Sequence, residues 1–295
     1  MNYISSKNCP IYLNLSDGGA VNTGSHFFVA KDVSFSYDAS IEGNKIFGED
    51  RVSSDFSHSG PAAGKLTMEV YPLIGQHSAQ NTANQMALIT GATGDYFSGA
   101  SVLFGNLDLR QCYLSSLNLK ISPQSTISVS ANFDVYDLSR ISGVAFSGAN
   151  ISNLLTTNGS GAYLEGIHAL AVGSSGSGVS LPNCKAEIDV SYSCQREPSY
   201  ALGATVPQTV ILTSVQKQLT IRGENVGQFV SYSGGLANFD LYFAPLSSFI
   251  TGGESFNAVS NGLFSIRTRG RVSSQNLQAG EEGLNGSVIL QENVF

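Results

Sequence analysis

The stretch Ile127-Ser128-Val129-Ser130-Ala131-Asn132-Phe133-Asp134-Val135 alternates apolar and polar side chains at every step. Successive side chains of a β-strand point to opposite faces, so this alternation predicts a strand with one buried and one solvated face. Burial on one face only is typical of antiparallel sheets. The same alternation occurs at 66–70, 117–121 and 237–243. The sequence therefore predicts an all-β, antiparallel fold.

Departures from the strand pattern are few. Between Ser78 and Ile89 the apolar residues have a spacing that could form one face of a helix, and a weaker pattern of this kind lies near Asn150 to Leu155. The run Gly173–Gly178 is typical of a loop or a hairpin tip. Long Gly/Ser loops are expected near 92–105 and 156–180.

An internal echo indicates two related halves. Three elements share an offset of 155 residues: Ser36-Tyr37 with Ser191-Tyr192, Glu42 with Glu197, and Gly48 with Gly203. Ala131–Tyr136 (ANFDVY) also resembles Ala237–Tyr242 (ANFDLY), with a spacing that gives the first copy 49 extra residues. The echo predicts two tandem β units, residues 1–145 with a helical insertion near 76–105, and residues 146–295. Coincidence between two strand-rich halves is the alternative.

Composition favours a protein that packs against copies of itself. Charged residues make up 13% of the chain, against about 25% in typical soluble domains. Uncharged polar surfaces leave few charges to desolvate at a contact. The net charge is −7, whereas proteins that bind nucleic acid usually carry an excess of lysine and arginine.

The termini and the cysteines predict a cytoplasmic origin. The first ten residues lack the apolar run of a signal peptide, and no stretch approaches the roughly 20 apolar residues of a membrane span. We therefore expect a protein made in a cytoplasm, without a membrane partner. In that compartment the four cysteines are expected to be free, buried thiols; they are Cys9, Cys112, Cys184 and Cys194.

Catalytic and cofactor motifs are not recognisable. The four histidines are not paired at metal-ligand spacing, and neither Cys-x-x-Cys nor Gly-x-Ser-x-Gly occurs. Gly60–Leu66 fails as a phosphate loop, because only three residues separate its glycines and Leu66 replaces the metal-binding hydroxyl. We expect no enzymatic activity, no cofactor and no metal. Carboxylate pairs for glycoside hydrolysis depend on three-dimensional geometry, so a hydrolase on a β scaffold stays as an alternative.

A short basic stripe is the one candidate contact site. Arg267, Arg269 and Arg271 alternate with smaller or apolar residues, so on a strand their guanidinium groups share one face. This pattern favours a contact with an acidic partner surface, either a neighbouring subunit or a nucleic-acid backbone. A solvated outer face is the alternative.

Two phrases carry a family resemblance. Cys112–Ser125 (CYLSSLNLKISPQS) with Ser130–Tyr136 (SANFDVY) resembles strand segments of bacteriophage tail tube proteins and related virion proteins, and Ile188–Gly203 is similar in style. The phrases cover a small part of the chain. The resemblance implies a β-sandwich or half-barrel with a flanking helix, which assembles into stacked rings around a DNA channel in the virion. It implies no catalytic residues.

The resemblance also implies partners. They are copies of the chain and other tail proteins, while genomic DNA passes through without specific binding. If each half is one tube unit and six units close a ring, three chains form it with pseudo-sixfold symmetry; if the echo is accidental, six chains are needed. The channel wall is expected to be acidic or neutral, with the three arginines turned toward a neighbouring subunit. A receptor- or carbohydrate-binding β-sandwich of the virion surface is the alternative function.

Overall fold

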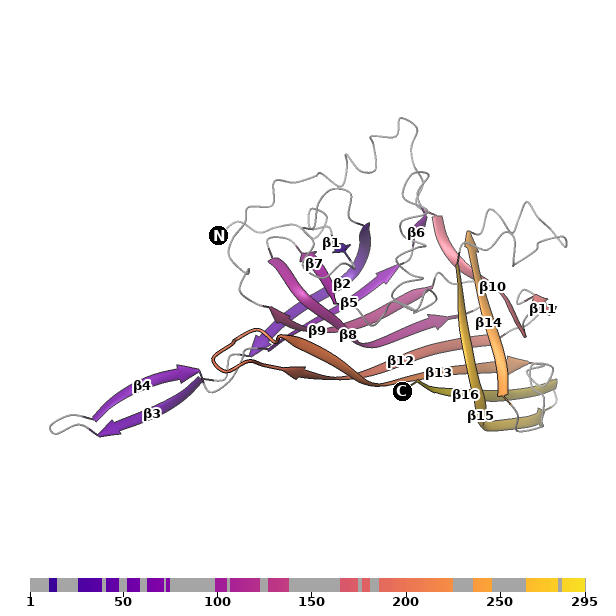
Figure 1. Ribbon diagram of the computed structural model, residues 1–295. Coiled ribbons are helices and arrows are strands. Elements are labelled where there is room, and N and C mark those ends of the chain that lie inside the picture. Colours follow the sequence, from indigo (N-terminus) through magenta and orange to yellow (C-terminus); the bar gives the residue numbers. More distant parts are fainter. Residues whose placement is uncertain are drawn as a thin grey trace, which may run out of the picture.

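The computed structural model describes the chain in segments. These are residues 11–14, 26–38, 41–47, 52–58, 63–71, 73–74, 99–104, 107–122, 127–137, 165–174, 177–180, 186–224, 236–245, 264–280 and 283–294. All regular structure in these segments is β, and every strand pair is antiparallel (Figure 1). The all-β prediction is confirmed. The two predicted helices, at 78–89 and 150–155, lie outside the described residues.

The strands vary from two to 17 residues in length. They are β1 (Ile11–Asn14), β2 (His26–Asp38), β3 (Ile41–Phe47), β4 (Val52–His58), β5 (Ala63–Tyr71), β6 (Leu73–Ile74), β7 (Ala100–Phe104), β8 (Leu107–Ile121), β9 (Ser128–Asp137), β10 (Glu165–Ser174), β11 (Ser177–Ser180), β12 (Ala186–Ser199), β13 (Thr209–Glu224), β14 (Leu236–Pro245), β15 (Phe264–Gly280) and β16 (Gly283–Val294).

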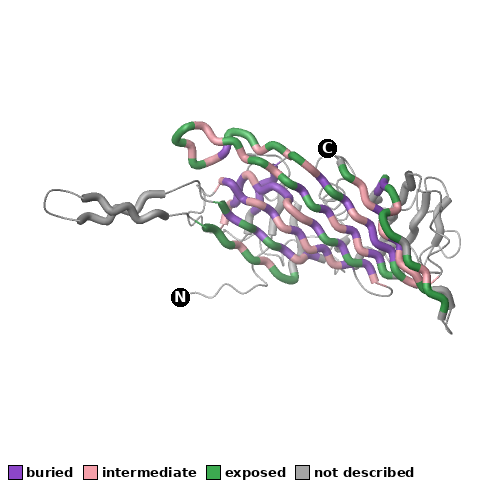
Figure 2. Tube along the Cα trace, turned by 90° about the horizontal axis from the view of Figure 1, so that it is seen from below, coloured by how far each residue is buried: buried purple, intermediate pink, exposed green. Residues whose placement is uncertain are grey.

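Alternating side chains give the sheet its two faces, as the sequence predicts. In β9 the residues Val129, Ala131, Phe133 and Val135 are buried, whereas the intervening Ser, Asn and Asp residues are half-buried. Neighbouring strands keep the same phase, so buried positions align across the sheet in Figure 2. The apolar face forms the core, and the other face is polar.

One large sheet contains most strands. Its order is β11-β10-β14-β15-β16-β13-β12-β8-β7-β1-β2-β5-β9, with β6 paired to β10, and β3 and β4 form a separate hairpin. The N-terminal strands curl back, so that β9 also pairs with β8. One edge of β8 therefore carries β9, while its other edge is divided between β7 and β12.

A four-strand arrangement occurs twice in this sheet. The first unit is β2-β5-β9-β8 and the second unit is β12-β13-β16-β15, in spatial order. Their registers correspond. In the first unit one row of paired residues is Phe35, Leu66, Phe133 and Leu114; in the second unit the corresponding row is Val190, Leu219, Leu290 and Val272.

Only part of the sequence echo follows this correspondence. Ser36-Tyr37 and Ser191-Tyr192 occupy corresponding positions of β2 and β12, one residue after Phe35 and Val190. The second echo does not, because Ala131–Tyr136 belongs to β9 and Ala237–Tyr242 belongs to β14, which lies outside the second unit. Short alternating strands resemble one another by composition alone. The match between Ala131–Tyr136 and Ala237–Tyr242 therefore does not mark corresponding positions of the two units.

The 49-residue excess inferred from that echo is therefore wrong. Leu66 and Leu114 are 48 residues apart, and their counterparts Leu219 and Val272 are 53 residues apart. The predicted helical insertion at 76–105 also ends in strand β7, and the expected loop at 156–180 contains β10 and β11. The hairpin tip at Gly173–Gly178 is confirmed, because these two glycines are paired.

Two hairpins project to the same side of the molecule in Figure 1: β3–β4, and the distal part of β12–β13. The β12–β13 hairpin turns through residues 201–204, where the Ala204 amide donates to the Ala201 carbonyl at 3.0 Å. Gly203 has φ +79°, as the third residue of a type II turn requires. The turn carries Leu202 fully exposed, at 108%.

Candidate functional site

The polar face of the sheet runs unbroken across both units. One row of directly paired residues crosses seven strands: Glu69, Ser130, Asn118, Ser191, Gln218, Gln291 and Arg271. Directly paired residues point to the same face of a sheet. Five of these seven side chains are uncharged amides or hydroxyls, and we call the whole surface the polar face.

Hydrogen bonds between neighbouring strands hold the polar face. Thr67 Oγ1 donates to Asn132 Oδ1 at 2.8 Å, and Asn132 Nδ2 donates to Ser116 Oγ at 2.7 Å. Asn132 and Ser116 also line a shallow hollow of about 500 Å³ over β5, β8, β9 and β12. Asn132 thus links the polar side chains of three neighbouring strands, β5, β9 and β8.

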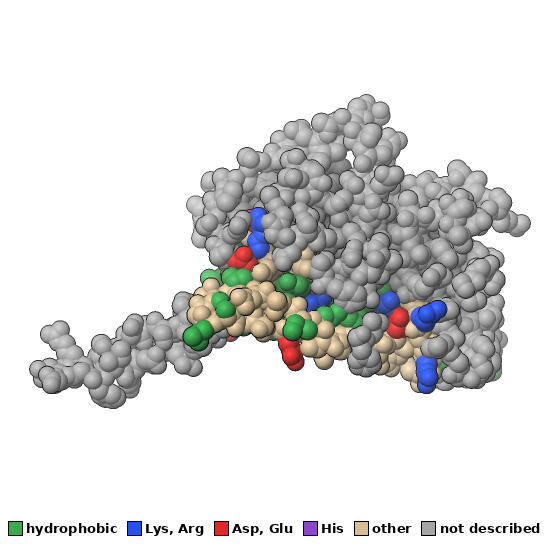
Figure 3. Space-filling model, in the orientation of Figure 1, with side chains coloured by type: hydrophobic (Ala, Val, Ile, Leu, Met, Phe, Trp, Pro, Cys, Tyr) green, Lys and Arg blue, Asp and Glu red, His purple; other side chains and the backbone are tan. Residues whose placement is uncertain are grey.

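Charges of both signs are interspersed on the described polar face, where Lys65 pairs in register with Asp134 and Lys120 with Asp189. Lys31 lies 2.9 Å from Glu69, and Arg222 lies 3.6 Å from Asp189. In Figure 3 the blue and red side chains of the described part of this face form small mixed groups, without one extended patch of either sign. Such a surface gives little electrostatic attraction for phosphates.

The two units join through β8 and β12. Six consecutive residues, Ser116–Ile121, pair with Ile188–Ser193. On the core side of this joint the apolar residues are almost completely buried: Leu117, Leu119, Ile121, Ile188, Val190 and Tyr192. Backbone pairing and apolar burial together make one continuous sheet out of the two units.

Arg196 adds a contact next to this joint. Its Nη1 donates to the Leu114 carbonyl at 2.6 Å, and its guanidinium lies 5.4 Å from the centroid of the Tyr113 ring. Tyr113 in turn packs on Tyr136, with ring centroids 5.9 Å apart. Burial raises the pKa of the neighbouring Asp134 carboxyl, although Lys65 and Arg196 oppose the shift. This arrangement ties β12 to β8 and β9.

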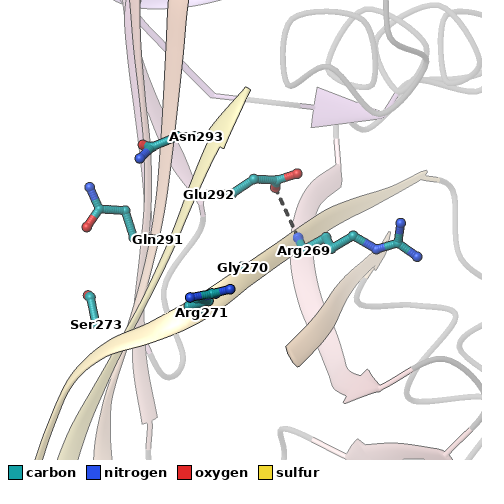
Figure 4. A pocket seen from close by; sticks show the side chains of 7 residues that line it. All are labelled: Arg269, Gly270, Arg271, Ser273, Gln291, Glu292 and Asn293. Atoms are coloured by element: carbon teal, nitrogen blue, oxygen red, sulfur yellow. Dashed lines mark hydrogen bonds between the residues drawn. The ribbon is translucent and has the colours of Figure 1, made fainter. Parts of the chain in front are cut away.

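The predicted arginine stripe lies on β15, as the sequence indicates. Arg269 and Arg271 are exposed, whereas the side chain of Arg267 lies outside the described residues. The register places Arg271 opposite Gln291, on the polar face. The two described arginines border a hollow of about 470 Å³, which Ser273, Gln291, Glu292 and Asn293 also line (Figure 4).

A bend in β15 separates the two described arginines. The N-terminal part of β15 pairs with β14 up to Arg271, and the remainder pairs with β16. At the bend a Cβ on Gly270 would lie 2.5 Å from the Gln291 carbonyl oxygen, so only glycine permits this approach. The Arg269 amide donates to Glu292 Oε2 at 3.0 Å, and its side chain extends away from the other labelled residues in Figure 4.

Glu292 also reaches a buried lysine. Lys217 Nζ lies 3.5 Å from Glu292 Oε2 and 5.2 Å from the centroid of the Tyr192 ring. Burial lowers the pKa of Lys217, and the Glu292 carboxylate opposes the shift. The ion pair and the ring stabilise the charged amine beside the joint. These contacts are structural.

Within the described residues, no group of three or more His, Cys, Asp or Glu side chains has an arrangement that could hold a metal ion. A membrane-spanning helix is not found in the described segments. Comparison of the sequence with known protein families and with curated proteins finds no match in either.

Sequence reasoning missed the joint and the true second echo. Leu114–Leu119 reads LSSLNL, and Val272–Leu277 reads VSSQNL. These phrases occupy corresponding positions of β8 and β15. An offset of 158 residues separates them, close to the 155 of the first echo. A sequence search that allowed the offset between the two units to vary by a few residues could have matched each of the four strands with its counterpart.

Proposed function

We propose that this chain is a virion structural protein, a phage tail tube subunit that self-assembles into stacked rings enclosing a DNA conduit. The observation that carries the proposal is the polar face, which continues over both four-strand units as one row of mainly uncharged side chains. A ring built from such units would present this face to its channel.

The chemistry of the polar face suits passage of DNA without binding. The affinity of proteins for DNA comes mainly from lysine and arginine contacts to phosphates, and each contact adds to its salt dependence. Cations on the described polar face are scattered, and Lys31 and Arg222 are close to carboxylates. Arg271 shares this face, and Arg269 borders the same hollow. In a wall built from this face they would form a small basic cluster, whereas the sequence led us to expect the arginines to turn toward a neighbouring subunit.

The paired units support a ring of three chains. Each chain presents two corresponding sets of four strands side by side, as two neighbouring subunits of a ring would. Three chains then give six such sets with pseudo-sixfold symmetry. The low charge of the chain, 13% of residues, favours close contacts between copies.

Exposed hydrophobic residues support assembly as well. The large hydrophobic side chains that stand exposed in the described part are Tyr37, Leu202 and Ile211. They lie at the end of β2 and on the projecting β12–β13 hairpin. Leu202 and Ile211 share the projecting hairpin, where they are accessible to a neighbouring copy.

Electron microscopy of the purified protein tests the proposal. We expect rings or tubes with a central channel, threefold symmetry in cryo-EM averages, and a native mass of three chains for a soluble ring. DNA should not be retained by these particles at physiological salt. As a matched comparison, Ser130→Lys with Ser191→Lys should create salt-dependent DNA retention in assembled particles. A protein that stays monomeric at high concentration, alone and with other tail proteins, contradicts the proposal.

One observation favours a second function, that of a carbohydrate-binding virion surface protein. Tyr37, Lys65, Asp134 and Tyr136 border a hollow of about 510 Å³. Hollows lined by aromatic side chains and a few charged groups are typical of small-molecule sites, a class that includes sugars. A glycan array separates the two functions, because a conduit subunit should bind no glycan. Saturable binding that Tyr37→Ala abolishes, together with compact trimers, would favour the surface protein.

A further inference from the structure

The joint between the two units has a repeating geometry. The last strand of the first unit, β8, pairs through Ser116–Ile121 with Ile188–Ser193 of β12, the first strand of the second unit. The second unit ends in β15, and the first unit begins in β2. The internal joint uses the last strand of one unit and the first strand of the other. The remaining first strand, β2, and the remaining last strand, β15, do not take part in such a joint within the chain.

The matching positions on those strands follow from register. Val190 corresponds to Phe35, so Val33–Asp38 of β2 correspond to Ile188–Ser193. In β8 the register shifts between Leu114 and Ser116, and in β15 it shifts in the same way between Val272 and Ser274. Ser274–Ala279 therefore correspond to Ser116–Ile121. Among the pairings of the described strands, none occupies these edges of β2 and β15.

Burial differs between the used and the unused edges. Val33 and Phe35 are half-buried and Tyr37 is 62% exposed. Their counterparts Ile188, Val190 and Tyr192 are 0%, 0% and 3% exposed. The unused edges have the same apolar phase as the joint, but no other described strand pairs with them.

The β15 edge shows the same difference. Leu277 is half-buried and Ala279 is exposed, whereas their counterparts Leu119 and Ile121 are 0% and 8% exposed. A strand added along either edge would bury these side chains and pair the open backbone groups.

We propose that Ser274–Ala279 of one copy pair antiparallel with Val33–Asp38 of a second copy, in the register of the internal joint. Phe35 then faces Leu277 as Val190 faces Leu119, and Ser36 faces Asn276 as Ser191 faces Asn118. The sheet then continues from one chain to the next, and a ring forms when the last chain pairs with the first. This inference therefore rests on the proposed ring function. The occupant is a copy of this chain, because the chain itself carries both halves of the joint.

Charge and shape at the paired edges permit this contact. The six residue pairs contain no like charges, since only Asp38 is charged and it faces Ser274. In the internal joint Arg196 donates a hydrogen bond to the Leu114 carbonyl. The joint between copies would lack this bond, because the residue 155 positions before Arg196 is Ile41. The joint between chains should therefore open before the joint within a chain does.

Engineered cysteines test the register. We would make Ser36→Cys with Asn276→Cys as the matched pair, and Ser34→Cys with Asn276→Cys as the shifted pair. Ser191→Cys with Asn118→Cys places the bond in the internal joint as a positive control. Under mild oxidation of assembled particles, non-reducing gels should show covalent links between chains, at least about tenfold more for the matched pair than for the shifted pair. Single-cysteine variants give the background from the four native thiols.

Hydrogen exchange of the unmodified protein gives a second readout. Amides of Val33–Asp38 and Ser274–Ala279 should gain protection when the protein assembles, while those of Ile188–Ser193 are protected in both states. If rings form without matched cross-links and without new protection, the edge pairing is overturned and the ring function stands. If no rings form and neither readout changes, both proposals fail.

Discussion

The hydroxyl of Ser115 donates to the Asn132 carbonyl at 3.1 Å, and the hydroxyl of Ser273 donates to the Ile289 carbonyl at 3.3 Å. Each serine lies at the point where its strand shifts register against the next strand. The following residues, Ser116 and Ser274, pair with the acceptor residues Asn132 and Ile289. The same irregularity, held by the same side chain, thus occurs in both units.

Removing these hydroxyls should have small and independent effects. Ser115→Ala and Ser273→Ala each lose one hydrogen bond to a backbone carbonyl, which should lower the free energy of unfolding by about 0.5–1.5 kcal/mol. The serines belong to different units and share no partner, so the double variant should show the sum. Urea denaturation of the three variants measures this. An effect above about 3 kcal/mol for either single change would contradict a simple hydrogen-bond role.

The corresponding core residues Phe133 and Leu290 should both be critical. Phe133 is 3% exposed and Leu290 is 0% exposed. Phe133→Ala should cost about 3–5 kcal/mol and Leu290→Ala about 2–5 kcal/mol, because each leaves a cavity in a packed face. Ser130→Ala on the polar face serves as the matched control, with a change of about 0.5 kcal/mol or less. Phe239, the other phenylalanine singled out by the echo, has a side chain outside the described residues.

Two glycines should respond differently to substitution. Gly203 has φ +79° with open space around it, so Gly203→Ala should cost about 1–2 kcal/mol from backbone strain. Asparagine tolerates this conformation, so Gly203→Asn should recover most of the loss. Gly270 fails for a steric reason, since the atom in the way belongs to the backbone of Gln291. Gly270→Ala and Gly270→Asn should therefore both destabilise β15, by about 1–3 kcal/mol or more; thermal unfolding of the four variants gives the comparison.

Asp134→Asn should stabilise the protein at neutral pH. Burial raises the pKa of Asp134 above its usual value of 3.8, so the folded state binds this proton more tightly than the unfolded state does. The contribution of Asp134 to stability then falls as pH rises from 3.8 through the raised pKa. The gain from Asp134→Asn should be small at pH 3 and reach a plateau by pH 7, below about 1 kcal/mol because water reaches the carboxyl.

Denaturation at a series of pH values measures that profile. Asn132→Ser provides the control, because it changes the next polar-face position without adding or removing a titrating group. Its effect on stability should be the same at every pH. A gain from Asp134→Asn that is already complete at pH 3 would show that the pKa shift is not its cause.

The four cysteines should all be present as thiols rather than in disulfides. Cys112 and Cys194 are buried thiols outside any disulfide of the described residues, and burial raises the pKa of Cys194. Both should resist a thiol reagent in the native protein because both are buried, and the raised pKa of Cys194 also makes its reactive thiolate scarce. After denaturation without reductant, all four cysteines should react. A loss of two thiol equivalents would reveal a disulfide, and Cys184 with Cys194 was the pair nearest in sequence.

Much of the local structure could be predicted from the sequence. Strands such as β9 and β5 follow from alternation alone, since a period of two assigns each side chain to a face without reference to any other strand. The hairpin tip at Gly173–Gly178 also followed from composition. The arginine stripe was correctly placed on a strand, but the face it shares with Gln291 depends on pairing with β16.

The neighbours of each strand could not be read from the sequence. Alternation states which residues are buried, but a buried Phe133 fits equally well beside many apolar strands, so pairing and register depend on contacts between residues far apart in the chain. The echo at Ala237–Tyr242 shows the difficulty, because it matches in letters and not in position.

By itself the sequence determined that this protein is built from antiparallel strands with one apolar and one polar face, because that property depends only on the local alternation of side chains. The tertiary structure decided that β8 lies beside β12, that two four-strand units share one register, and that β2 and β15 each keep an edge that no other described strand pairs with. Those features arise from hydrogen bonds and apolar contacts between distant segments, whose free energy is gained only when the whole sheet is assembled.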